Sequence, residues 1–361
     1  MMDDKMKVRL QEDKEMKNMN ITFFIGNGFD INLGLHTKYS EFYPYFMEHA
    51  RKDNMIKRWI NESEQPWADL EEKLGKELAK LAGNEVDYFY EDKEELDTLL
   101  LEYLEKEQRR YCFGDNEVMR IEFTRSMLNF YDEMPTNDAN SLKSTMEKYK
   151  NEEYIYSYIT FNYTDVLDRI IDSYGNTRVI SNHQGNTIAK ANRIGKVIHI
   201  HGTTNEEMIL GVNDEGQIDN EFLKLDDMFL DTFIKRRMNY HIGQRKTESA
   251  IDMLSKSHIV CVFGMSIGNT DKMWWEEIIK WLDVNRDNKL VVFWKCGESA
   301  LKRKLPSTLI RLNEKLKREI FEKGKGENDE NYYSRIKDRI MISYNSSIFS
   351  FPKVIKSKEK I

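Results

Sequence analysis

The chain has 361 residues, 32% of them charged, and a formal net charge of −7, which gives no electrostatic support for binding nucleic acid in bulk. Its three cysteines (Cys112, Cys261 and Cys296) lie far apart without a Cys-x-x-Cys pair, which argues against structural zinc and a disulfide scaffold. Because no run of eighteen apolar residues and no signal-peptide pattern occurs, we expect a cytoplasmic protein that does not enter a membrane.

The first predicted strand, residues 21–25, is a short apolar run of the kind that is buried on both faces of a sheet. It ends in Gly26-Asn27-Gly28, where the glycines allow a tight turn and a close approach of the backbone to a ligand. A helix is predicted from Phe29 onward. A strand, a glycine turn and a helix N-terminus together form the geometry that binds the phosphate or ribose of a nucleotide. Gly34 is too distant to complete the Gly-x-Gly-x-x-Gly fingerprint, so a tight turn without a ligand is the alternative.

Residues 45–150 change character, because their apolar residues recur at helical spacing and no β-rich run interrupts them. Leu70, Leu74 and Leu78 belong to one such stripe, and residues 119–131 contain another. We predict a helical insertion over this range. Its aromatic residues are predicted to pack in the core. Alternatively, they form the walls of a pocket over the first glycine turn.

Strand patterns return after residue 150 and alternate with helical ones, which predicts a Rossmann-like α/β fold with a mostly parallel sheet and flanking helices. We divide the chain into a leader (1–19), a nucleotide-binding domain (20–44 and 151–350), the helical insertion (45–150) and a basic tail (351–361). The predicted strands are residues 156–161, 178–180, 196–200, 208–211, 258–263, 289–294 and 339–344, and the helical stretches are 165–173, 220–256, 270–283 and 307–322.

Polar residues follow several of these strands. In an open parallel sheet, ligands bind outside the carboxyl ends of the strands, so these residues form the candidate site. Any one of them alone is usually a cap or turn residue. They are Asn27 and Asp30 after the first strand, Asn162 and Asp165 after the second, His201, Asn213 and Asp214 further along, and Gly264, Ser266, Asn269 and Asp271 after the strand at 258–263.

His199 and His201 are separated by one residue, so both are predicted to point to the same face of their strand. His201 lies at the carboxyl end and is the candidate general base, because a neutral imidazole accepts a proton near neutral pH. His199 is predicted to be a core histidine or a partner of the catalytic residues. Metal binding by the pair is poorly supported, since no acidic or cysteine ligand is paired with it in the sequence.

Gly264-Met-Ser-Ile-Gly268 fits the nucleophile elbow of α/β-hydrolases, but that fold needs a histidine after the serine in chain order. The last histidine here is His258, so we interpret this segment as a second nucleotide-binding turn. A P-loop is excluded, because no Gly-x-x-x-x-Gly-Lys-Ser/Thr motif occurs.

Five longer motifs extend over most of the chain: the opening segment from Phe24 to Tyr39, Trp67-Ala-Asp-Leu-Glu71, Thr160-Phe-Asn-Tyr-Thr-Asp165, His199-Ile-His-Gly202 and the segment from Gly264 to Asp271. They resemble the AbiH-like family of bacterial abortive-infection proteins, which implies a role in defence against phage by stopping the growth of the infected cell. More distantly, the order of the motifs is similar to that of sirtuins and sirtuin-like NAD-consuming effectors of phage defence, which implies a sirtuin-like fold.

The sirtuin-like resemblance implies cleavage of the nicotinamide–ribose bond of NAD, with water as the acceptor. By this resemblance Asn162 would position the ribose or the water, and His201 would accept a proton, while the site stabilises an oxocarbenium-like transition state. The two glycine turns would hold the pyrophosphate and adenosine side. The implied nucleotide-binding set is Gly26, Asn27, Gly28, Phe29, Asp30, Asp165, Gly264, Ser266, Asn269 and Asp271.

Asp30 and Asp165 depart from the sirtuin-like pattern, and the zinc module of deacylating sirtuins is missing, so protein deacylation is not implied. Asp30 stands where that pattern has serine, and Asp165 is one residue further from Asn162 than in that pattern. We expect Asp30 to accept hydrogen bonds from ribose hydroxyls, because beside a phosphate its charge would need a bridging cation.

Two other classes of function stay open. The chain would be a nucleotide-sensing module that binds an ADP-ribose-like ligand without turnover, or a metal-assisted phosphoesterase or nuclease using Asp30, Asp165, Asp214 or Asp271 for Mg²⁺. No metal is favoured. The expected partner is NAD or a related nucleotide. The sequence names neither the phage trigger nor the oligomeric state, and a homo-oligomer stays open.

Overall fold

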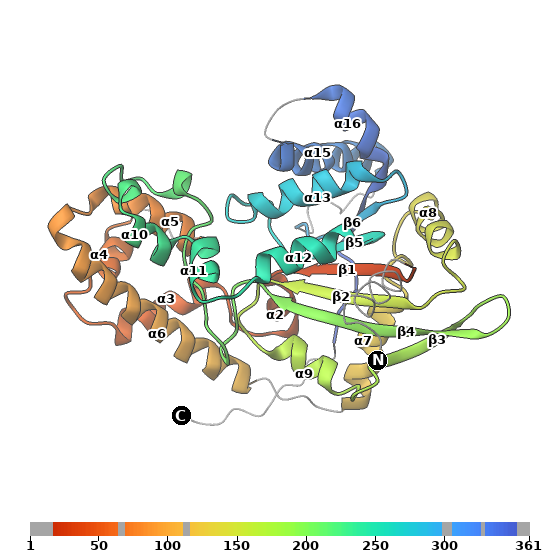
Figure 1. Ribbon diagram of the computed structural model, residues 1–361, viewed down its shortest axis with the longest axis horizontal. Coiled ribbons are helices and arrows are strands. Elements are labelled where there is room, and N and C mark those ends of the chain that lie inside the picture. The colour runs from red at the N-terminus through yellow and green to blue at the C-terminus, as the bar shows by residue number, and fades with distance from the viewer. Residues whose placement is uncertain (1–16, 64–68, 111–115, 298–304, 326–328, 352–361) are drawn as a thin grey trace, which may run out of the picture.

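A seven-stranded sheet organises the computed structural model, which describes residues 17–63, 69–110, 116–297, 305–325 and 329–351 (Figure 1). Its strand order is β3-β4-β2-β1-β5-β6-β7, and every neighbouring pair is parallel except β3 with β4. The predicted α/β fold with a mostly parallel sheet is confirmed. The strands are β1 (Met19–Ile25), β2 (Tyr154–Thr160), β3 (Val179–Gln184), β4 (Ala189–His199), β5 (Ile259–Phe263), β6 (Lys289–Trp294) and β7 (Ile340–Tyr344).

The strand order reverses at β1, which has β2 on one side and β5 on the other. Ile25 at the end of β1 is level with Thr160 of β2 and with Phe263 of β5. Thr160 is in turn level with His199 at the end of β4. Four strands therefore end at one edge of the sheet, around the reversal point where open α/β sheets bind ligands.

Helices cover both faces of the sheet, because successive side chains of each buried strand point to opposite faces and both faces are apolar (Figure 1). Phe23 and Tyr158 pack on one face with Phe123 of α7, whereas Phe24 and Val260 pack on the other with Trp275 of α13. The first layer contains α7 (Asn116–Leu128), α8 (Thr136–Glu147) and α9 (Val166–Asp172), and the second contains α12 (Lys246–Ser255), α13 (Lys272–Val284), α15 (Pro306–Lys325) and α16 (Glu330–Ile336).

The remaining helices form a lobe with a core of its own, at the left of Figure 1. We call α3 to α6, α10 and α11 the helical lobe. Trp59, Leu74 and Leu96 pack there against Phe229, so segments from both sides of β2 in the sequence share this core. The lobe helices are α3 (Tyr39–His49), α4 (Met55–Glu62), α5 (Leu70–Glu77), α6 (Val86–Arg110), α10 (Asp227–Phe233) and α11 (Lys235–His241), and the short α2 (Gly28–Leu33) joins β1 to the lobe.

The helices of residues 45–150 are divided between two cores, whereas the sequence predicted one insertion. No strand occurs among the described residues of this range. However, the stripe of Met119, Phe123 and Met127 on α7 packs under the sheet, while α4 to α6 pack in the helical lobe. Helical spacing shows that a stripe is buried, but it does not show which surface buries it.

Two further sequence predictions differ from the structure. Residues 208–211 form no strand. Ile209 and Leu210 are buried, but the segment does not pair with the sheet, and an isolated bridge joins the next residue, Val212, to Ile234. The single helical stretch predicted over 220–256 is three helices, of which α10 and α11 belong to the lobe and α12 to the sheet.

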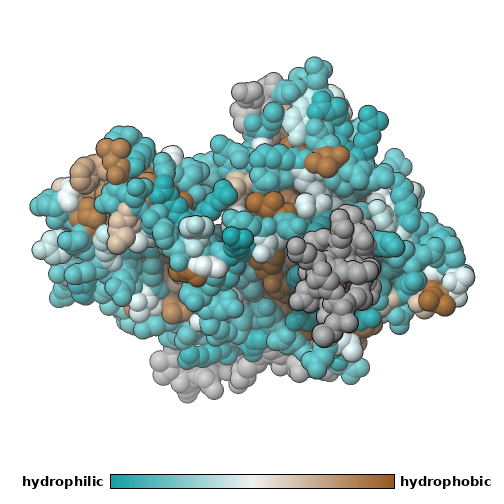
Figure 2. All heavy atoms as spheres, in the orientation of Figure 1, coloured by the Kyte–Doolittle hydropathy of each residue, from teal (hydrophilic) through white to brown (hydrophobic). Residues whose placement is uncertain are grey.

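The face of the molecule seen in Figure 2 is mostly hydrophilic. In the described part of the chain, no helix combines the length and the apolar character that crossing a membrane requires. Most of the predicted leader (1–19), most of the basic tail (351–361), Trp67 and Cys112 lie outside the described residues.

Candidate active site at the carboxyl ends of the strands

The turns after β1 and β5 touch each other directly. The backbone N–H groups of Gly26 and Gly28 donate to the carbonyl oxygens of Phe263 and Gly264, both at 2.9 Å. A Cβ atom on Gly26 would lie 2.5 Å from the Gly264 oxygen, and one on Gly28 would lie 2.4 Å from the Gly264 Cα. The glycines are therefore required for the packing of the two turns. The binding of a nucleotide by these turns stays a prediction.

Asp30 is buried in α2 at the base of the site, with 2% of its surface exposed. Asn162 donates through Nδ2 to Oδ1 of Asp30 at 2.9 Å, and Thr164 donates through Oγ1 to Oδ2 at 2.7 Å. Burial raises the pKa of Asp30 to about 7, although the two hydrogen bonds and nearby His199 act in the opposite direction. Both carboxylate oxygens are thus held by neighbouring side chains.

The partner of Asp30 fixes the orientation of the Asn162 side chain. Because the Asp30 oxygen is the acceptor, the NH₂ group of Asn162 faces Asp30 and the carbonyl oxygen Oδ1 faces the other way. Asn162 is 6% exposed, and its Oδ1 has no hydrogen-bond partner among the described residues. A buried amide oxygen without a partner is costly, so this oxygen is a natural acceptor for a ligand or a water.

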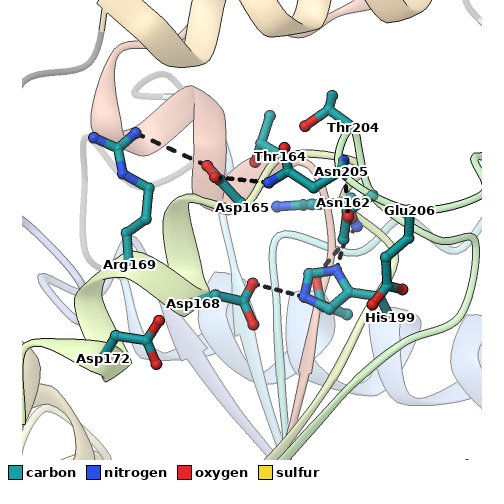
Figure 3. A network of polar contacts seen from close by, with 12 residues as sticks. Asn162, Thr164, Asp165, Asp168, Arg169, Asp172, His199, Thr204, Asn205 and Glu206 are labelled. Carbon is teal, nitrogen blue, oxygen red and sulfur yellow. Dashed lines mark hydrogen bonds and ion pairs between the residues drawn. The ribbon is translucent and has the colours of Figure 1, made fainter. Parts of the chain in front are cut away.

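His199 supports the backbone of Asn162 from below (Figure 3). Its Nε2 lies 2.7 Å from Oδ2 of Asp168 on α9, and its Nδ1 lies 3.3 Å from the Asn162 carbonyl oxygen. Asp165 contacts different groups: Asn205 donates to its Oδ2 at 3.0 Å, and Arg169 lies 3.8 Å from its Oδ1.

His201 lies past the end of β4, which stops at His199. Its ring packs 5.8 Å from Phe161 and 6.0 Å from Tyr163, measured between centroids. Phe161 stacks on Phe24 and belongs to the α12–α13 face, whereas His199 contacts α9 on the opposite face. The predicted common orientation of the two histidines is wrong, because strand alternation ends with the strand. Burial, together with the charge of Lys235, holds the pKa of His201 well below its usual value.

The family whose description is "Bacteriophage abortive infection AbiH" matches residues 22–294. The chain belongs to this AbiH family. No curated protein matches it. The match extends from β1 to the end of β6 and includes Asp30, Asn162 and His201, so the predicted family is confirmed.

The second predicted turn of this AbiH protein, residues 264–271, is tied to α5 of the helical lobe. Thr270 donates through Oγ1 to Oδ2 of Asp69 at 2.9 Å, and Asn269 donates to Glu72 at 3.3 Å. Ser266 donates through Oγ to Oδ2 of Asp271 at 2.7 Å. Burial raises the pKa of Asp271 to about 6.

The side chains of Asn27 and Phe29 have partners within the protein. Asn27 donates to the Thr37 carbonyl oxygen at 2.9 Å and accepts from the Thr37 hydroxyl at 2.5 Å. Phe29 is fully buried, with its ring centroid 5.4 Å from that of Phe349. A contact of these two residues with a nucleotide stays a prediction.

A buried ion pair between Glu71 and Lys235 stands beside the site, and the sequence analysis did not assign it a function. Glu71 lies on α5 and is 6% exposed, whereas Lys235 begins α11 and is 5% exposed. The single hydroxyl hydrogen of Tyr163 is shared between the Ile209 carbonyl oxygen at 3.0 Å and Glu71 at 3.3 Å. Glu71 belongs to one of the family-like motifs, which is a usable signal, but nothing in the sequence singles out Lys235.

Two further observations describe the surroundings of the site. Within the described ranges, no three His, Cys, Asp or Glu side chains are grouped so that they could hold a metal ion. A cavity of about 330 Å³ lies between α6 and the segment that follows His201, and Tyr90, Asp97 and Met208 are among its lining residues.

Proposed function

We propose that this AbiH-family chain cleaves the bond between nicotinamide and ribose in NAD, with water as the acceptor, and that the loss of NAD stops the growth of the infected cell. The family's description connects it with bacteriophage abortive infection. Support for the reaction itself comes from residues at the carboxyl edge of the sheet.

The observation that carries the proposal is the buried carbonyl oxygen of Asn162, which has no hydrogen-bond partner in the part of the chain that the structure describes. It faces away from Asp30 at the point where the strand order reverses, and it can only accept a hydrogen bond. A ribose hydroxyl and an attacking water are both donors of the required kind. The hydrogen bond to Asp30 holds the Asn162 side chain in one orientation, so this oxygen would align a donor that reaches it.

His201 is the proposed proton acceptor: burial and the charge of Lys235 lower its pKa, so the ring is unprotonated at neutral pH, although the same effects make it a weaker base. In the proposed reaction the water oxygen forms a bond to the anomeric carbon of the ribose. The carbon–nitrogen bond breaks, and its electron pair passes to the nicotinamide ring, which leaves as a neutral molecule. The water proton passes to His201 and then to solvent, so that ADP-ribose, nicotinamide and a proton are the products.

The acidic surroundings of the second turn suit a hydroxyl donor better than a phosphate. Asp69 and Asp271 lie beside this turn, and Coulomb repulsion would disfavour a pyrophosphate there. In the proposed complex, therefore, the adenosine ribose contacts residues 264–271 through its hydroxyls.

The direct test is to incubate the purified protein with NAD and to measure nicotinamide release. His201→Ala and Asn162→Ala should each lower the rate about 10²- to 10⁴-fold, the usual contribution of an acid–base or positioning group. His49→Ala and Asn182→Ala are the matched controls, since both side chains are exposed and distant in the fold, and they should retain the wild-type rate.

Two outcomes would favour the other classes of function. Tight binding of NAD or ADP-ribose without nicotinamide release by the wild-type protein would indicate a sensing module. Cleavage of a phosphate ester that stops with EDTA and returns with Mg²⁺ would indicate metal-assisted chemistry.

A further inference from the structure

A buried ion pair inside the helical lobe, between Glu71 of α5 and Lys235 of α11, lies beside the candidate site. The two residues are 164 positions apart in the chain, and both side chains are almost completely buried. Burying two charges is costly even when they are paired, so a lobe that served only for stability could be built with apolar residues at these positions.

Tyr163 connects this ion pair to His201. Its hydroxyl donates to Glu71, while its ring lies 6.0 Å from the His201 ring. On the other side, Asn239 of α11 donates to the carbonyl oxygen of Ile200, the residue before His201, at 3.3 Å. The helix that begins with Lys235 is thus fastened to the backbone that carries the histidine.

We propose that the ion pair of Glu71 and Lys235 is a positioning element of the site, through which the helical lobe controls the proton exchange of His201. The proposal rests on the function proposed above. The charge of Lys235 disfavours the imidazolium form of His201. The ion pair with Glu71 holds this lysine in place at the start of α11, the helix whose Asn239 bonds the backbone before His201.

The charged and titratable groups around His201 come from both parts of the molecule. Lys235 is the cation among those that affect its pKa. The acidic and phenolic groups of this region surround the ion pair. They are Glu71 and Asp69 beside α5, Asp271 before α13, and the phenols of Tyr39 and Tyr163, which lie in the field of Glu71.

The test is an NMR titration of the imidazole carbon-bound protons, which does not depend on any activity. The chain has seven histidines, so the His201 signal is identified by its absence in His201→Gln. The informative variant is the double substitution Glu71→Gln with Lys235→Met, which removes both charges and leaves no buried charge unpaired. The matched control, Glu72→Gln with Lys76→Met, removes an ion pair from the exposed side of the same helix.

The His201 titration midpoint should rise by about half a pH unit or more in the double variant, because the nearby positive charge is gone. It should stay unchanged in the control and in Lys235→Arg, which retains the charge. An unchanged midpoint in the double variant overturns the proposal, and so does a Lys235→Arg shift as large as that of the double variant. A wild-type midpoint at or above about 6.5 overturns it as well, even if the variants fail to fold.

Nicotinamide release against pH separates this proposal from the function on which it rests. The acidic limb of the rate profile should move to higher pH in the double variant, by the same amount as the NMR midpoint. A protein that releases no nicotinamide but shows the NMR shift would refute the proposed reaction and retain the charge coupling. An NMR shift without any movement of the rate profile would refute the role in the reaction.

Discussion

The carboxyl edge of the sheet and the helical lobe both bury a carboxyl group beside the candidate site, but they stabilise it by different means. Asp30 is held by two neutral donors, Asn162 and Thr164, whereas Glu71 is held by the opposite charge of Lys235. Burial raises the pKa of both carboxyl groups. Neutral donors leave Asp30 able to exchange a proton near neutral pH, while Glu71 depends on a partner in a distant part of the chain. The comparison implies that the two regions should respond differently to substitution and to pH.

The largest expected effect is the loss of one member of the ion pair. Lys235→Met leaves Glu71 buried without its counter-charge, so the free energy of unfolding should fall by about 3–5 kcal/mol. The double variant Glu71→Gln with Lys235→Met should regain most of this loss. Urea unfolding followed by circular dichroism measures both.

The exposed pair of Glu72 and Lys76 on the same helix is the control for this measurement. Its removal should change the free energy of unfolding by less than about 1 kcal/mol. If Lys235→Met alone lowered the free energy of unfolding as little as this control does, Glu71 would not depend on the lysine for its stability, and the contrast with Asp30 would disappear.

Most of the sheet could be predicted from the sequence, because a buried parallel strand is a short apolar run that can be read locally. Six of the seven observed strands overlap a later predicted strand, and the first coincides with the predicted run before Gly26. Residues 208–211 are equally apolar, yet they pack beside the helical lobe instead of pairing. Apolar character predicts burial, but pairing depends on which neighbours the fold brings alongside.

The second prediction concerns Asp30, the neutral-donor side of the comparison. Its pKa in the folded protein, about 7, lies above the ordinary value of 3.8, so the folded state binds more protons than the unfolded state between these values. Stability from this group is therefore present at acidic pH and is lost as the pH rises from about 4 to about 7, by roughly 4 kcal/mol.

Asp30→Asn should remove this dependence, so that the free energy of unfolding falls less steeply between pH 5 and pH 7.5 than in the wild type. Asp271→Asn is the comparison variant. Burial raises the pKa of Asp271 only to about 6, so its contribution to the pH dependence of the free energy of unfolding should end at a lower pH than that of Asp30. Parallel curves for the wild type and Asp30→Asn would show that Asp30 is not protonated in this range.

The candidate site was predictable only in part. Asn162, His201 and Asp30 could be placed at one edge because parallel strands end together there. Their contacts could not be predicted: Asp30 meets Asn162 across 132 positions, and Lys235 meets Glu71 across 164. The first contact follows from the pairing of β1 with β2 and the second from the packing of the helical lobe, and the local pattern describes neither. The predicted ribose contact of Asp30 accordingly has to compete with Asn162 and Thr164 for the same two oxygens.

The smallest expected effect concerns His199, which supports Asn162 without facing the proposed reaction. His199→Ala removes the contact with Asp168 and the support of the Asn162 carbonyl oxygen. Asp168 is partly exposed, so water can replace the lost partner, and the free energy of unfolding should fall by only about 1–2 kcal/mol. Thermal melting should show the change, with His49→Ala as an exposed control.

Nicotinamide release by His199→Ala should fall less than about tenfold, against the loss of about 10²–10⁴ expected for His201→Ala. If a folded His199→Ala protein lost release as completely as His201→Ala does, then His199 with Asp168 would be the proton acceptor, and the assignment of the two histidines would have to be exchanged.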